Sequence, residues 1–344
     1  MELFGLSQAA WSQIGFAATS IVAGIVVCVG YFWGSNFILD KALPSDVTGN
    51  ELNISNENRR SAVRPWLFLF PALLFLGLFL FYPFVMTLIN SFMDKNSEAF
   101  VGFDNWRFIT GQEKFWEAVF NNLMWIIVVP AACTFLGLVI AVMADKIWWG
   151  TLAKTLIFLP MAISFVGASV IWKFVYEFQS GETQIGLLNA VVKFFGGDPT
   201  SYIDMAFWNN FFLMIILIWI QTGFAMVILS AALRGIPEET IEAATLDGAN
   251  GFQIFWRIMV PQVMGTVLVV WTTITILVLK VFDIVFTMTD GQWDTQVLAN
   301  YMFFWLVRGD HDGYSSVVAL TIMIAVLPIM IWNIRNANKE QGAR

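Results

Sequence analysis

The sequence predicts an all-α integral membrane protein, a polytopic bundle of about seven transmembrane helices. Hydrophobic residues make up 58% of the 344 positions and charged residues only 12%, against about 25% charged residues in an average soluble protein. The apolar residues are gathered into runs of roughly 20, and a helix of that length crosses the hydrocarbon core of a bilayer. Polar segments separate these runs, so the chain is expected to cross the membrane repeatedly.

Residues 1–65 are expected to form one span and a polar linker. Ile14–Trp33 carries no charged residue and is long enough to cross a bilayer. A cleaved signal peptide would begin with basic residues, whereas this chain begins with Glu2 and no Lys or Arg, so the span is expected to be retained. The linker is expected at residues 34–65, and its basic end beside the next apolar run is typical of a cytoplasmic boundary. The basic residues there are Arg59, Arg60 and Arg64.

Six further apolar segments are expected to span the membrane. They are predicted at residues 66–90, 118–144, 152–175, 205–233, 264–288 and 314–334. Pro130 and Pro160 fall inside two of them, where neighbouring helices can satisfy the carbonyls that a proline frees. With the N-terminus outside, more Lys and Arg residues fall on the cytoplasmic side than on the outer side, as the positive-inside rule requires. A polar loop at 234–262 and the tail at 336–344 would then lie in the cytoplasm.

The polar loop at residues 234–262 is expected to form a bent pair of short helices that projects from the membrane. Pro237 is expected at the first helical position, where its missing N–H costs nothing. Ala243 and Ala244 give the first helix a narrow face, and Gly248 provides a stop and a sharp turn. A second short helix follows before the next apolar run. A projection of this shape is suited to a groove in another protein.

Within this loop, a set of residues follows a fixed spacing: Glu242-Ala243-Ala244, Gly248, Ile258 and Pro261. The pattern resembles the EAA loop of bacterial ABC importer permeases, in which the loop is the coupling helix that docks on a cytoplasmic ATPase. Val260 stands where this family usually has Leu, which is a mild departure. The resemblance implies that ATPase coupling is carried by Glu242, Ala243, Ala244, Asp247, Gly248, Ile258 and Pro261.

The resemblance covers residues 66–335 and implies the six-helix permease core of a type I ABC importer, to which residues 1–65 add one helix and a linker. The implied partners are a second permease subunit, two cytoplasmic ATPase subunits, an extracytoplasmic solute-binding protein and a sugar. ATP and Mg would be used by the ATPase, because this chain has no Gly-Lys-Ser/Thr phosphate loop. The chain would bind no cofactor itself, and its net charge of −7 gives no case for nucleic acid. It is expected to be a non-enzymatic translocation subunit of the bacterial inner membrane.

Polar and aromatic side chains inside the spans are the candidates for the sugar pathway. Uncharged hydrogen-bonding groups and aromatic faces suit a hydroxyl-rich cargo. A purely structural role is the alternative for each of them, because Thr can bond its own backbone, Asn and Gln can join helices, and Trp favours bilayer interfaces. The candidates are Asn209, Asn210, Trp219, Gln221, Thr222, Trp271, Thr272, Thr273 and Thr275.

Lys280 and Asp283 add an ionisable pair to this pathway. They are three residues apart in the span predicted at 264–288, so they are expected on one helix face, where an ion pair can form. Such a pair inside a span suggests a functional site. The alternative places Lys280 near the outer boundary with its ammonium group reaching water.

The segment that contains this pair also narrows the resemblance. Together with Asp290-Gly291-Gln292, where many sugar permeases carry Gly-Gly-Pro, it resembles the α-glucoside branch of the carbohydrate importers. That branch implies substrates such as sucrose, maltose, trehalose or glucosylglycerol. The sequence favours none of them over the others.

The remaining features are less specific. Phe100–Trp106 is similar to an outer segment of sugar-type permeases, and it also fits a turn anchored by aromatic residues. Cys28 and Cys133 both fall in apolar runs, so neither a disulfide framework nor a zinc site is predicted. His311 is the only histidine and is expected to be a solvated loop residue rather than a metal ligand.

Three other functions compete with the importer. An ion-coupled secondary transporter would show intramembrane acids or inverted repeats, and the spans hold almost no acidic residue. A retinal-binding photoreceptor that uses Lys280 would leave the loop at 234–262 unexplained. An intramembrane enzyme would need a cluster of His, Cys or acidic residues in the membrane. The importer permease is therefore the predicted function, with ion-coupled transport as the alternative.

Overall fold

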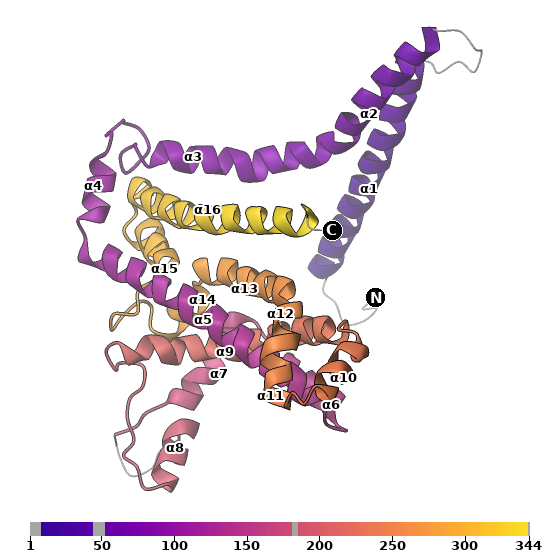
Figure 1. Cartoon of the computed structure of the whole chain (residues 1–344). Coiled ribbons are helices and arrows are strands. Elements are labelled where there is room, and N and C mark those ends of the chain that lie inside the picture. The colour runs from indigo at the N-terminus through magenta and orange to yellow at the C-terminus, as the bar shows by residue number, and fades with distance from the viewer. Residues whose placement is uncertain (1–7, 44–51, 181–184, 343–344) are drawn as a thin grey trace. The chain divides into compact units, whose positions relative to one another are not determined.

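The computed structural model describes residues 8–43, 52–180 and 185–342, and these are helical almost throughout (Figure 1). Among the described residues, one isolated β-bridge joins Met93 and Phe100. The chain divides into two compact units, Met1–Val85 and Met86–Arg344.

The first unit is built from two long helices. They are α1 (Gln8–Ala42) and α2 (Leu52–Leu76), and α2 continues through the π-helical turn η2 (Gly77–Phe81) into α3 (Tyr82–Asn90). The polar linker expected at 34–65 is thus helical up to Ala42 and again from Leu52. Neither residues 35–42 nor residues 52–64 contain Gly or Pro, so nothing in them interrupts a helix.

The two long helices run antiparallel. The hydroxyl of Tyr31 donates to the backbone carbonyl of Leu67 at 2.7 Å, and Arg60 forms an ion pair with Asp40. The described apolar side chains of both helices are largely exposed, as expected for helices that are apolar all round and face lipid.

Three helices form the centre of the second unit: α5 (Glu113–Asp145), α9 (Trp208–Arg234) and α13 (Met264–Leu279). The backbones of α5 and α9 approach closely at Gly137, where an added Cβ would lie 2.6 Å from the Cβ of Ala225. Small residues permit such an approach, and helices in membranes associate largely through close packing of this kind. Among the described residues, most of the fully buried apolar side chains belong to the cluster around these helices, and a smaller cluster includes Ile109 and Val317.

Residues 152–175, expected as one span, instead form two helices that meet at an angle of 105°. The elements are α6 (Gly150–Phe158), the 3₁₀ turn η3 (Leu159–Ala162) and α7 (Phe165–Tyr176). Pro160 stands at the start of η3, where it cannot supply an N–H to a continuing helix. Ser164 then restarts the chain as the N-cap of α7, because its hydroxyl accepts a hydrogen bond from the N–H of Gly167 at 3.1 Å.

The span expected at 264–288 is also interrupted. Helix α13 ends at Leu279, and α14 (Asp283–Met288) begins after a break of three residues. The prediction that Lys280 and Asp283 lie on one helix face is therefore wrong. Lys280 follows the end of α13, whereas Asp283 begins α14, where a carboxylate is favoured by the helix dipole.

Shorter elements complete the second unit. They are α4 (Asp104–Thr110), α8 (Leu187–Phe194), α15 (Leu298–Phe303), the π-helical turn η5 (Phe304–Arg308) and the long α16 (Asp312–Gly342). The Phe100–Trp106 segment folds as a turn into α4, and the side chain of Asn105 donates to the carbonyls of Ser91 at 3.0 Å and Met93 at 2.6 Å. Asn105 is buried, so it ties the end of α3 to α4.

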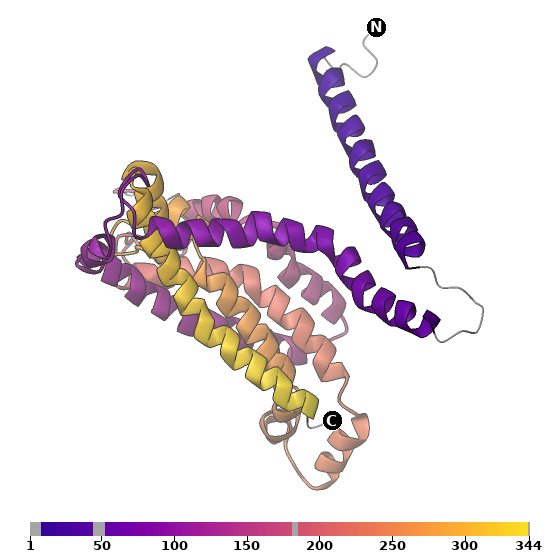
Figure 2. The ribbon, with the colours of Figure 1, turned by 90° about the horizontal axis from the view of Figure 1, so that it is seen from above.

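The two ends of the second unit differ. The helices of the polar loop, α10 to α12, lie at one end, here called the loop end, and α4 and α15 lie at the other, here called the far end (Figure 1, Figure 2). Five helices of the described residues are long and apolar enough to cross a membrane, or up to seven if each bent pair counts as one span. The predicted all-α membrane bundle is confirmed.

Candidate functional site

The polar loop after α9 folds as a compact projection. It comprises α10 (Glu238–Leu246), α11 (Gly251–Ile254), the π-helical turn η4 (Phe255–Met259) and α12 (Val260–Gln262). Gly248 has a φ of +83°, a left-handed conformation that glycine adopts without steric cost, and it follows the end of α10 as predicted. Asn250 and Gln253 form a capping box in which each side chain accepts a hydrogen bond from the other residue's N–H at 2.9 Å. Pro237 is the N-cap of α10 and not its first helical residue, because its ψ of 133° is extended.

The projection has a buried and an exposed side. Ala244 is only 7% exposed, whereas Leu246 is 88% and Phe252 is 72% exposed. Large apolar side chains on the outside of a polar projection indicate a contact with another protein. Leu246 and Phe252 were not among the predicted contact residues, although an apolar side chain within a polar loop is a signal that the sequence offers. The other predicted coupling residues are exposed or half-buried: Glu242, Ala243, Asp247, Gly248, Ile258 and Pro261.

The buried side connects the projection firmly to the bundle. Ile236, Val260 and Val263 are buried in the same apolar cluster as Leu233 of α9 and Val270 of α13. Because protein interiors are close-packed and resist deformation, a displacement of the projection must be shared by the two helices that enter and leave it.

A polar cluster surrounds the point where α9 passes into the projection. The ammonium group of Lys154 donates to Asp145 at 2.5 Å and to the hydroxyl of Ser230 at 2.7 Å. Arg234 donates to the same hydroxyl at 3.1 Å. These residues come from α5, α6 and α9, so the cluster joins three helices at the loop end, beside a pocket of about 430 Å³.

Among the threonines predicted for the pathway, Thr222, Thr272 and Thr275 are buried in the bundle, whereas Thr273 is exposed. Thr222, Thr272, Thr273 and Thr275 each donate to the backbone carbonyl four residues earlier, at distances between 2.6 and 2.8 Å. These bonds agree with the structural alternative, yet each hydroxyl oxygen can still accept a further hydrogen bond. Gln221 is buried and Trp271 is half-buried. Contact of these side chains with cargo stays a prediction.

A pocket of about 340 Å³ lies at the break between α13 and α14. Lys280 and Asp283 both line it, together with Phe165 of α7 and Leu217 of α9. No ion pair joins Lys280 to Asp283 among the described residues, although such a pair was expected. The break instead places both ionisable groups on the wall of one cavity, which lies between α9 and the end of α13. Trp219, also predicted for the pathway, lies against Trp172 of α7 with ring centroids 5.8 Å apart.

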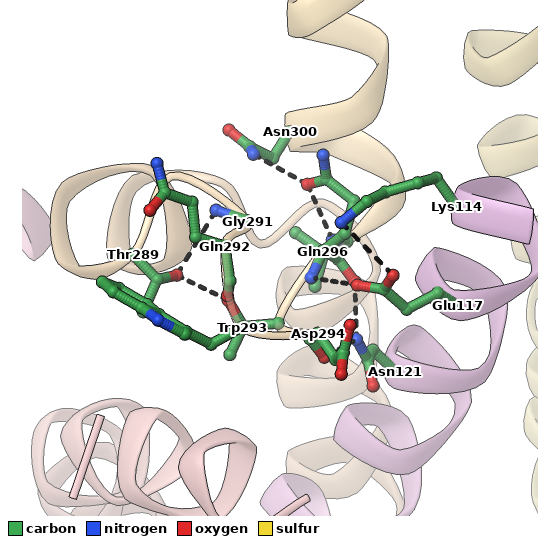
Figure 3. A network of polar contacts seen from close by, with 12 residues as sticks. Lys114, Glu117, Asn121, Thr289, Gly291, Gln292, Trp293, Asp294, Gln296 and Asn300 are labelled. Carbon is green, nitrogen blue, oxygen red and sulfur yellow. Dashed lines mark hydrogen bonds and ion pairs between the residues drawn. The ribbon is translucent and has the colours of Figure 1, made fainter. Parts of the chain in front are cut away.

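Buried asparagines hold the loop at residues 289–297 against the far end of the bundle. The amide of Asn209 donates to the carbonyl of Trp293 at 2.5 Å, and that of Asn210 donates to the carbonyl of Asp294 at 3.2 Å. Asn121 of α5 donates to the same Asp294 carbonyl at 2.9 Å (Figure 3). Two predicted pathway residues, Asn209 and Asn210, are thus engaged in positioning a loop, and their contact with cargo stays a prediction.

The loop that these asparagines hold has an unusual backbone. Asp290, Gly291, Trp293 and Asp294 have φ values of +53°, +73°, +53° and +59°. A left-handed conformation costs a residue other than glycine about 1–2 kcal/mol, so the surrounding hydrogen bonds must hold this loop in place. Backbone strain that the surroundings maintain is concentrated at functional sites.

His311 precedes α16 at the far end. Its ring stacks on Tyr314 with centroids 3.5 Å apart, and its Nδ1 accepts a hydrogen bond from the N–H of Tyr314 at 3.2 Å. Burial of the ring lowers the pKa of His311. The histidine lies in the loop before α16 as expected, but it is half-buried rather than solvated, and its side chain bonds to the first turn of that helix. No cluster of three or more His, Cys, Asp or Glu side chains that could hold a metal ion occurs in the part of the chain that the structure describes.

A known protein family matches most of the second unit. The family described as "Binding-protein-dependent transport system inner membrane component" matches residues 133–335, which include α9, the projection, α13 and the loop at 289–297. The chain belongs to this family. As a member it is a multi-pass permease of the inner membrane, a subunit of an ABC importer and not an enzyme.

Individual relatives extend this result over nearly the full chain. The permease is 58% identical to the alpha-glucoside transport system permease protein AglF of Rhizobium meliloti (strain 1021), over 96% of this chain and 99% of that protein. It is 49% identical to the osmoprotective compounds uptake permease protein GgtC of Synechocystis sp., over 80% of this chain and 99% of that protein. These relatives give no support to the ion-coupled alternative.

A solved structure shows the same fold. The permease matches a chain of a bacterial ABC transporter involved in the import of the acidic polysaccharide alginate with a TM-score of 0.71 and 20% identity. The match covers 82% of this chain and 99% of that chain. The predicted permease fold is thereby confirmed.

Proposed function

We propose that this permease carries neutral α-glucosides into the cell, and that a separate cytoplasmic ATPase drives it through the α10–α12 projection. One observation carries the proposal. The projection exposes Leu246 and Phe252 on its outer side, and its inner side is part of the same apolar core as α9 and α13. Such a body can bind another subunit and transmit that subunit's movement to two helices of the bundle.

The substrate class is supported by the relatives and by the charges in the bundle. A protein that is 58% identical to this chain is named for alpha-glucoside transport. The cavity at the α13–α14 break is lined by one lysine and one aspartate, Lys280 and Asp283, beside aromatic and aliphatic side chains. One charge of each sign together with apolar walls suits a neutral, hydroxyl-rich molecule.

The proposed assembly contains a second permease, two ATPase subunits that use ATP and Mg, and an extracytoplasmic solute-binding protein. The family description itself names dependence on a binding protein. A solved alginate transporter with the same fold is in complex with a pentasaccharide-bound periplasmic protein. Lys154 and Arg234 at the loop end support a cytoplasmic projection, because basic residues are enriched on that side. The N-terminus would then lie outside and the C-terminus inside.

In the proposed mechanism, closure of the ATPase subunits displaces the projection. The Asp145–Lys154–Ser230–Arg234 cluster ties α5, α6 and α9 together, so these helices would move as one group. Leu217 of α9 and Lys280 line the cavity at the α13–α14 break, so movement of α9 would change the shape of that cavity. The cavity would then open to one side of the membrane and the other in turn. Polar and aromatic residues of α9 and α13 would then meet the sugar.

A pair of cysteine variants in the projection tests the coupling. Leu246→Cys places a thiol at a fully accessible position, and Ala244→Cys, two residues away, is a matched control at a buried one. In native membranes, Leu246→Cys is expected to crosslink to an ATPase subunit in a manner that changes with ATP, and Ala244→Cys is expected to crosslink far less. Absence of any crosslink from Leu246→Cys, with its thiol shown to be accessible from the cytoplasm, would contradict the coupling role.

Uptake measurements test the substrate class in the same membranes. Radiolabelled sucrose, maltose, trehalose and glucosylglycerol are supplied together with ATP and the binding protein. At least one of them is expected to accumulate in an ATP-dependent manner. If none accumulates while the complex hydrolyses ATP, the α-glucoside proposal is wrong.

A further inference from the structure

A second hollow lies at the far end of the second unit, away from the projection. It has a volume of about 430 Å³ and shares no lining residue with the cavity that contains Lys280 and Asp283. Its walls come from the start of α5, the strained loop at 289–297, and the α15–η5 segment. Three amide side chains and three aromatic rings line it: Gln112, Gln292, Gln296, Tyr301, Phe304 and Trp305.

The charges in this hollow balance. The two cations that line it each face a carboxylate: Arg308 pairs with Asp290 at 2.5 Å, and Lys114 pairs with Glu117 at 3.5 Å. A phosphate or another anion would therefore find no unpaired cation there, and a cation would find no unpaired carboxylate. The paired groups still have spare hydrogen-bonding capacity, because a guanidinium carries five N–H donors and a carboxylate about four acceptor sites. Glu117 pairs with Lys114 without lining the hollow, and with it the charges of the site balance. The hollow is also rich in polar groups.

Hydrogen bonds fix the floor of the hollow before any ligand enters. The side-chain oxygen of Gln296 accepts from the amide of Asn300 at 2.7 Å, and the backbone N–H of Gln296 donates to Glu117 at 3.1 Å (Figure 3). An added Cβ at Gly291 would lie only 2.4 Å from that same side-chain oxygen. Glycine at this position therefore lets Gln296 pack against the loop, with its amide nitrogen left as a donor. A rigid set of donors and acceptors lowers the entropic cost of binding.

We infer that this hollow is an entry subsite that binds one neutral sugar unit before the sugar reaches the spans. The pyranose ring would stack on the half-exposed ring of Phe304, and the Gln112 and Gln296 amides and the Asp290–Arg308 pair would bond its hydroxyl groups. The aromatic rings supply apolar area and the amides supply orientation, which is the usual composition of a small-molecule site. This inference rests on the proposed sugar import and adds a second binding position at the opposite end from the projection.

Protection of a single thiol tests the inference in the complete transporter. Gln292→Cys places a thiol on the exposed wall of the hollow, and its alkylation by a membrane-impermeant maleimide is timed with and without the best imported α-glucoside. The unsubstituted protein, with Cys28 and Cys133 only, gives the background labelling. Arg107→Cys, at a far-end position with an 81% exposed side chain outside the hollow, is the matched control. The sugar is expected to slow labelling of Gln292→Cys and to leave Arg107→Cys unchanged, and an equal concentration of mannitol is expected to protect neither.

A second substitution measures the aromatic contribution. In the Gln292→Cys background, Phe304→Ala is expected to raise the sugar concentration that gives half-maximal protection about three- to tenfold, the range of one aromatic contact. Leu306→Ala, in the same π-helical turn but outside the lining, is expected to leave it unchanged. If the transporter imports the sugar but the sugar does not slow labelling of Gln292→Cys, the subsite is overturned and the proposed function stands. If no α-glucoside is imported, the proposed function fails and the subsite fails with it.

Discussion

At the residue scale, backbone conformation explains the need for glycine at position 248. Its φ is +83° and an added Cβ would meet no atom within 4 Å, so space does not limit a substitution but conformation does. Gly248→Val is expected to cost about 1–2 kcal/mol in the left-handed region and to change the angle between α10 and α11. Sugar uptake should then fall while ATP hydrolysis continues.

Gly248→Asn is the control, because asparagine tolerates positive φ better than other residues do. It is expected to keep most of the coupling that Gly248→Val loses. Uptake and ATP hydrolysis are measured in the same vesicles for both variants. Normal coupling in Gly248→Val would show that the left-handed turn is not needed by the projection.

The spacing of the loop residues located the candidate coupling site, but it could not separate inward from outward positions. Ala243 and Ala244 look equivalent in the sequence, yet Ala244 is buried and Ala243 is exposed. That difference depends on how α10 packs on its own loop. Similarly, Asn209 and Asn210 were selected because they are polar residues at the start of an apolar run. Their partners are backbone carbonyls more than 80 positions away, and no local pattern reveals such partners.

At the scale of elements, the close contact between α5 and α9 depends on Gly137. An added Cβ there would lie 2.8 Å from the backbone nitrogen of Met226, and backbone cannot move aside as a flexible side chain can. Gly137→Leu is expected to destabilise the protein by about 1–3 kcal/mol, the usual cost of overpacking a core. Gly24→Leu in α1 is the matched control, because its Cβ would meet nothing within 4 Å. Thermal unfolding of the purified protein should show a lower midpoint for Gly137→Leu than for Gly24→Leu, and equal midpoints would contradict the packing argument.

Hydropathy predicted where the helices are but not where they bend. Each expected span lies mostly in helix, because a run of about 20 apolar residues satisfies its backbone in a bilayer only as a helix. Pro160 was recognised inside a span, but a proline in a membrane helix can produce a mild kink or a full break, and here it accompanies a turn of 105°. The break at residues 280–282 contains neither Gly nor Pro, so it had no local signal. After the break, α14 packs against α7 and α9, contacts that are distant in sequence.

At the scale of the whole molecule, the sequence predicted two regions of different character, an added first part and a permease core. The apolar core clusters of the second unit draw their buried residues from position 109 onward. The arrangement of that core follows from helix contacts that are distant in sequence, which a single sequence does not reveal. The far-end hollow could not be predicted for the same reason, since its walls come from residues near 112, 292 and 304.

The apolar core clusters are built from residues of the second unit, and this leads to a prediction for the first unit. Deletion of residues 1–57 removes α1 but keeps the apolar helix Asn58–Asn90 and the basic residues at its start, which are expected to hold its orientation. Because the core clusters contain none of the described residues of the deleted part, 8–43 and 52–57, the free energy of unfolding of the core is expected to change by less than about 0.5 kcal/mol. The truncated permease should therefore insert, assemble with its ATPase and import sugar, as measured by membrane fractionation, copurification and uptake. If it inserts and assembles but no longer imports, the first helix takes part in transport itself, and the division into an accessory helix and a self-sufficient core is wrong.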